Sequence, residues 1–131
     1  MSGSAQAEAL LAEARQLLDR GDSELGSVAT RAAALLGRSA LEEAIWSLFP
    51  SLKEVNSRAM LLTFTAVMST TTGPRAAMAG GRLTTASHHH VYEMPLTPAE
   101  LTPLLDVVHD MIGAIRARQA RAVELRRPST S

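Results

Sequence analysis

The sequence predicts an all-α protein, an up-and-down bundle of four to five helices. Through most of the chain, apolar residues recur at spacings of three and four, the period of one face of a helix. Prolines, glycines and capping residues divide this pattern into segments of helical length. No stretch alternates apolar and polar residues for long enough to indicate a strand. We therefore expect one helical domain over residues 1–126 and a disordered tail over residues 127–131.

The first two helices follow from their apolar stripes and their breakers. Leucines and alanines between residues 10 and 18 form the stripe of a first helix, which Gly21 ends. A second apolar pattern runs on to Pro50, which cannot continue a helix. Gly37, inside this second helix, weakens it by about 1 kcal/mol relative to alanine, which leaves room for a kink or break there.

The next two helices differ in character. Residues 53–69 are apolar on nearly every side, so we expect a third helix that its neighbours surround. Pro74 stands where the first position of a fourth helix is expected, and Pro95 closes that segment. Gly80 and Gly81 make the start of the fourth helix uncertain.

The fifth helix has the strongest start signal in the chain. Residues 97–100 read Thr-Pro-Ala-Glu, a capping box with proline at the first helical position. Pro103, near the end of the first turn, is expected to bend the helix. The apolar face that follows consists of Leu101, Leu104, Leu105, Val108, Met111, Ile112 and Ile115.

Composition excludes several classes of function. The absence of cysteine excludes disulfides, a catalytic thiol and cysteine-bearing zinc sites. No secretory signal and no apolar run of about 20 residues is present, so we expect a cytoplasmic protein without a membrane segment. Thirteen basic and thirteen acidic residues cancel. Residues 116–131 nevertheless carry five arginines against Glu124, which indicates either a solvated helix end or a handle for a phosphate backbone.

The residues best suited to catalysis or binding lie in the segment from Arg82 to Glu93. This segment contains three of the four histidines and the only tyrosine. Consecutive residues on a helix point about 100° apart, so His88, His89 and His90 cannot all face one metal ion, and we expect no metal site. Seven residues place His89 only about 20° from Arg82 on the helical wheel, and Tyr92 lies near the same face.

Arg82 and His89 are separated by a rise of about 10.5 Å, too far for both to grip one phosphate easily. Two copies meeting across a two-fold axis bring the arginine of one toward the histidine of the other, so this spacing favours a homodimer. An arginine binds phosphate bidentately, and a histidine moves a proton to or from a ribose hydroxyl. Together, with Tyr92 orienting the phosphate, they suffice for metal-independent cleavage of RNA.

Two plainer interpretations stay open. Histidines at the end of a helix stabilise its dipole when protonated, so the triplet can be a simple cap. Arg82 can form an ordinary ion pair with Glu93, Glu42 or Glu43. Arg38 and Glu42, one turn apart, are most simply a surface pair, although inside a bundle they can orient an arginine–histidine site.

These residues resemble the HEPN superfamily, small all-α dimers in which four to six residues separate an arginine from a following histidine. Both Arg82-x5-His88 and Arg82-x6-His89 satisfy that spacing, and residues 38–42 resemble the arginine-bearing, alanine-rich early helix of these domains. The resemblance implies a metal-independent endoribonuclease with no cofactor, acting as a toxin or in defence, with an antitoxin or other protein partner. It assigns catalysis to Arg82 with His88 or His89, and substrate binding to His90, Tyr92, Arg38 and Glu42. It also allows a non-catalytic module that binds a partner protein or a nucleotide.

Overall fold

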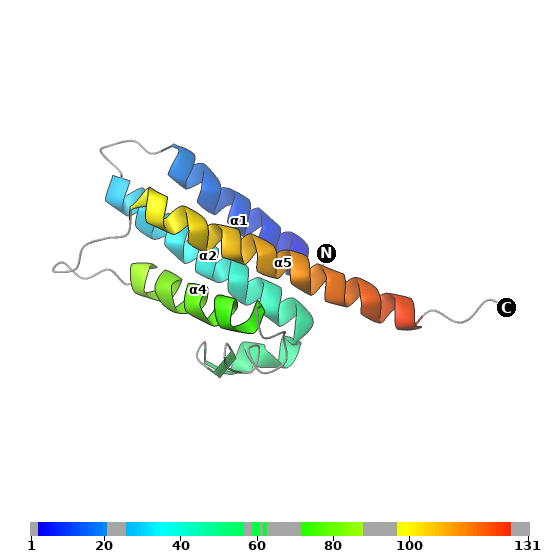
Figure 1. The fold of residues 1–131 in the computed structure, drawn as a ribbon. Helices are drawn as coiled ribbons and strands as arrows, with labels where there is room; N and C mark the ends of the chain where they lie inside the picture. Colours follow the sequence, from blue (N-terminus) through cyan, green and yellow to red (C-terminus); the bar gives the residue numbers. More distant parts are fainter. Residues whose placement is uncertain are drawn as a thin grey trace.

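The computed structural model describes residues 3–20, 26–56, 59–60, 62, 72–87 and 97–126. These residues are helical apart from short connections and contain no strand, which confirms the predicted all-α class. The elements, shown in Figure 1, are α1 (Gly3–Asp19), α2 (Gly26–Leu48), the 3-10 helix η1 (Pro50–Glu54), α4 (Thr72–Ser87) and α5 (Pro98–Arg126). None of these described helices is long and apolar enough to cross a membrane.

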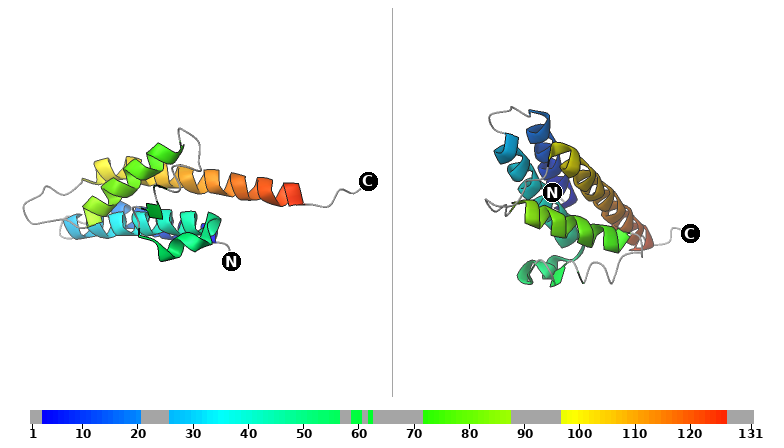
Figure 2. Two further views of the ribbon diagram at one scale, coloured as in Figure 1. Left: turned by 90° about the horizontal axis from the view of Figure 1, so that it is seen from below. Right: turned by 60° about the vertical axis from the view of Figure 1, so that its left-hand side comes forward.

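The long helices pack as a bundle in which α2 contacts α1, α4 and α5 (Figure 2). Helix α5 runs antiparallel to α1, because Arg15 near the end of α1 pairs with Asp106, while Glu8 near its start pairs with Arg116. Helix α4 lies against α2 and α5 on the other side. The described part of the chain is therefore bundle-like, as the apolar periodicity predicts.

The core lies where these four helices meet. Alanines dominate the contribution of α2, so the neighbouring helices approach it closely, and branched residues of α5 fill the centre. The largest fully buried side chains belong to Leu41, Ile45, Met60, Leu83, Leu101, Leu105, Val108, Met111, Ile112 and Ile115. Every position of the predicted apolar face of α5 is buried.

The predicted capping box is confirmed at the start of α5. The Thr97 hydroxyl accepts a hydrogen bond from the Glu100 backbone N–H at 3.2 Å, and the Glu100 carboxylate accepts one from the Thr97 backbone N–H at 3.2 Å. Pro103 lies inside α5, which continues through it without a break. The proline is exposed, and as the sixth residue of the helix it removes only the hydrogen bond to the Ala99 carbonyl oxygen.

The expected third helix begins later than residue 53. Residues 50–54 form η1, and Val55 is extended, with φ −103° and ψ 159°. The next helical turn begins instead at Asn56, whose side-chain oxygen accepts a hydrogen bond from the Ala59 backbone N–H at 2.8 Å. A local capping side chain therefore overrides the apolar pattern. Met60 is buried but Leu62 is 63% exposed, and residues 63–71 lie outside the described part.

Gly37 does not break α2. The helix is continuous through it because the residue is buried at a point of close approach between α2, α4 and α5. A Cβ atom at this position would lie 2.6 Å from Leu105 Cδ2 and 3.5 Å from Leu83 Cδ2. The two leucines occupy the space that a larger side chain would take, so Gly37 fixes how α4 and α5 meet on α2.

Candidate functional site

Helix α4 is attached to the bundle through small residues and one leucine. Its buried positions include Ala76, Ala79 and Leu83, which recur at helical spacing. Leu83 is fully buried and lies against the Gly37 position of α2. This single large side chain fixes the rotation of α4 about its axis, and therefore determines which residues face outward.

Arg82, the residue before Leu83, is turned about 100° away and is exposed. It makes no hydrogen bond or ion pair with any residue that the structure describes, so the proposed ion pairs with Glu42 and Glu43 are absent. Helix α4 has no acidic residue, and its other arginine, Arg75, is paired with Asp110 at 3.0 Å. Among the described residues, no acidic side chain therefore compensates the charge of Arg82, and Glu93, the other proposed partner, lies outside them.

The exposed part of α4 around Arg82 carries no acidic side chain. We call Arg75, Met78, Gly81, Arg82 and Thr85 the α4 outer face. A Cβ added at Gly81 would meet nothing within 4 Å, and the Thr85 hydroxyl donates to the Gly81 carbonyl oxygen at 3.1 Å. Met78 is 48% exposed. Arg82 is exposed, and no acidic side chain of α4 competes with an anion for its guanidinium.

The Arg38–Glu42 pair is confirmed as an i, i+4 ion pair on α2. The Arg38 Nε atom donates to Glu42 Oε1 at 2.8 Å, and the side chains are only 25% and 17% exposed. Half-burial strengthens such a pair relative to one in open solvent. Arg82 makes no hydrogen bond or ion pair with Arg38 or Glu42. Any role of the Arg38–Glu42 pair in orienting Arg82 would therefore be indirect.

The histidines and the tyrosine of the predicted site lie outside the described residues. Helix α4 is described to Ser87, and His88, His89, His90 and Tyr92 all follow it. Of the predicted catalytic and substrate-binding residues, the structure therefore describes Arg82, Arg38 and Glu42. In the described ranges, no group of three or more histidine or acidic side chains is arranged to hold a metal ion.

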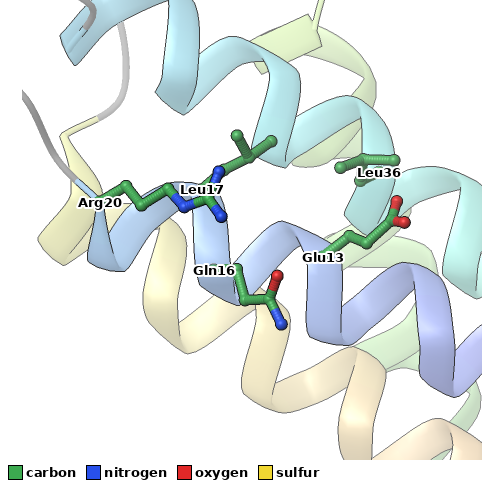
Figure 3. Close-up of a pocket in the computed structure, with 5 residues that line it drawn as sticks. All are labelled: Glu13, Gln16, Leu17, Arg20 and Leu36. Carbon is green, nitrogen blue, oxygen red and sulfur yellow. The ribbon is translucent and has the colours of Figure 1, made fainter.

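A shallow hollow lies between α1 and α2, away from α4 (Figure 3). It has a volume of about 260 Å³ and is lined by Glu13, Gln16, Leu17, Arg20 and Leu36. Sequence reasoning missed it, because its polar residues look like the ordinary outer face of α1. Its volume is below the roughly 300 to 1,000 Å³ of typical ligand sites, and its polar residues are exposed. It therefore lacks the enclosed polar groups that orient a ligand.

Comparison with known proteins assigns nothing further, because no family model, no curated protein and no solved structure matches this chain. The features that bear on function are thus the chain's own. Among the described residues predicted to form the site, the exposed Arg82 on the α4 outer face is the candidate for binding an anion.

Proposed function

We propose that this protein is a HEPN-like RNA-binding protein that cleaves RNA without a metal ion, at a cleft between two copies, in a toxin or defence role. The observation that carries the proposal is Arg82, exposed on an acid-free helix face six residues before the histidine triplet begins. An unpaired guanidinium is suited to a phosphate, which it binds through two parallel hydrogen bonds.

The division of labour follows from the chemistry of these groups. Arg82 binds the scissile phosphate and stabilises the charge that develops on it. His89, or His88, takes the proton from the ribose 2′-hydroxyl, and the attacking oxygen then forms a 2′,3′-cyclic phosphate as the bond to the leaving 5′-oxygen breaks. The second histidine in the dimer returns a proton to that leaving oxygen. His90 and Tyr92 contact the same phosphate.

A non-catalytic binding module is the second candidate, and Leu83 favours it. Members of the HEPN superfamily frequently carry a polar residue directly after the arginine. Here that position holds a fully buried leucine, which contributes to the core and supplies no polar group. In this version the same face binds a partner protein or a nucleotide through Arg82 and the exposed Met78.

The test is incubation of the purified protein with RNA in excess EDTA, followed by analysis of the product ends. We expect the wild type to release 2′,3′-cyclic phosphate ends. Arg82→Ala and His89→Ala should each lower the rate by roughly 10²-fold or more, since proton transfer and electrostatic stabilisation each contribute on that scale. His88→Ala, run in parallel, assigns the histidine.

Arg31→Ala is the matched control. Arg31 is also exposed and has no ion pair among the described residues, but it lies on α2, away from the α4 outer face. It should cleave as the wild type does. A folded wild type that leaves the RNA intact contradicts the nuclease. Binding of RNA or nucleotide that Arg82→Ala abolishes, without cleavage, would instead support the non-catalytic module.

A further inference from the structure

The charges of this neutral protein are divided sharply along the chain. Residues 1–115 hold eight basic and twelve acidic residues, a net charge of −4, whereas residues 116–131 hold five arginines and one glutamate, a net charge of +4. Most of the chain therefore repels a polyanion, while the last part attracts one.

The basic part of α5 extends beyond the bundle. We call residues 118–126 the α5 arm. Figures 1 and 2 both show α5 running on past the ends of the other helices. The arm leaves the bundle at Gln119, whose side-chain nitrogen donates to the Ser47 carbonyl oxygen at 3.2 Å. From Ala120 to Arg126, every residue except the half-buried Ala122 is exposed.

The arginines of the arm share one side of the helix. With 100° per residue, Arg118, Arg121 and Arg126 fall within an arc of about 140°, and Glu124 falls outside it. Leu125, 87% exposed, lies between Arg118 and Arg121 on the same wheel. The basic side of the arm thus combines several cations with one apolar side chain that no other part of the bundle covers.

We propose that the α5 arm binds the phosphodiester backbone of a single-stranded nucleic acid. Long arginine side chains on one side of a projecting helix can each contact a different phosphate, and Leu125 can pack on a sugar or base. The arm contains no aromatic residue on which a base could stack, so it reads the backbone and not the sequence. This binding does not depend on Arg82 or on cleavage.

The experiment measures binding of a fluorescein-labelled 20-nucleotide single-stranded RNA by anisotropy, between 50 and 200 mM NaCl. Removing two phosphate contacts should lower the slope of log affinity against log salt by about 1.4, since each contact contributes about 0.7 on a single strand. Over this salt range the wild-type affinity should therefore fall about 7-fold more than that of Arg121→Gln/Arg126→Gln. Glutamine keeps the helix propensity of the arm.

Arg20→Gln/Arg31→Gln is the matched control. It removes the same charge from exposed arginines that, like Arg121 and Arg126, have no ion pair among the described residues. The control should keep the wild-type slope. Equal losses in both variants, or no binding by the wild type at 50 mM NaCl, would overturn the proposal. The proposal would also be overturned if Arg121→Gln/Arg126→Gln kept the wild-type slope but lost a dimer that the wild type forms in sedimentation. That result would mean that the arm binds the acidic part of a second copy.

Arg82→Ala separates this inference from the proposed nuclease. It removes one proposed phosphate contact, so it should lower the salt slope by about 0.7, half of the change expected for the arm variant, while it abolishes cleavage. If the wild type never cleaves but its binding still depends on the arm, the nuclease proposal fails and the arm proposal stands. If cleavage depends on Arg82 but the salt slope does not depend on the arm, the arm proposal fails and the nuclease proposal stands.

Discussion

The two halves of α5 form one continuous helix with different physical origins. From Leu101 to Ile115 its apolar side chains are buried against three other helices, whereas the α5 arm buries almost nothing. The first half is held by tertiary packing and the second by local propensity, in a segment rich in alanine and arginine. A helix can therefore continue beyond the end of its buried apolar face, and the exposed part is available for binding.

The sharpest test of this contrast is truncation of one leucine in each half. Leu105→Ala should lower the free energy of unfolding by about 2 to 5 kcal/mol, because Leu105 is fully buried and its removal leaves a cavity beside Gly37. Leu125→Ala makes the same change at a side chain that is 87% exposed and should stay within about 0.5 kcal/mol. Urea unfolding of both variants measures the difference. Similar losses would mean that the arm is packed against something in solution.

Glycine-to-alanine substitutions sharpen the comparison with smaller effects. At Gly113, on the exposed side of α5, a new Cβ meets nothing within 4 Å, so alanine should stabilise the protein by about 0.5 to 1 kcal/mol through helix propensity. At Gly37 the same Cβ falls 2.6 Å from Cδ2 of Leu105, which is fully buried. Overpacking of about 1 to 3 kcal/mol then outweighs the propensity gain. Thermal unfolding should give opposite signs, and a stabilised Gly37→Ala would show that Leu105 relocates freely.

The same contrast explains what the sequence could and could not predict. The face of α5 and its cap were predictable, because periodicity and a capping box act locally and agree with the packing. The start near residue 53 was wrong, since a single asparagine cap outweighed an apolar run. The close approach at Gly37 was not predictable, because it depends on leucines of two other helices. Arg82 was predicted as a candidate, but its exposure follows from the burial of Leu83 and had to be observed.

The smallest effect on global stability is expected from loosening the arm. Ala120→Gly should cost the arm helix about 1 kcal/mol, yet leave the midpoint of global unfolding unchanged, because residue 120 is exposed and lies beyond Gln119, whose side chain bonds to Ser47. Hydrogen exchange should show amides of residues 120–126 exchanging far faster than those of residues 104–115 in the wild type, and faster still in the variant. Gly113, within the packed half, offers the matched comparison, since substituting it moves global stability. A lowered midpoint in Ala120→Gly would tie the arm to the folding of the bundle, and its exposed arginines would then have to be explained by packing and not by binding.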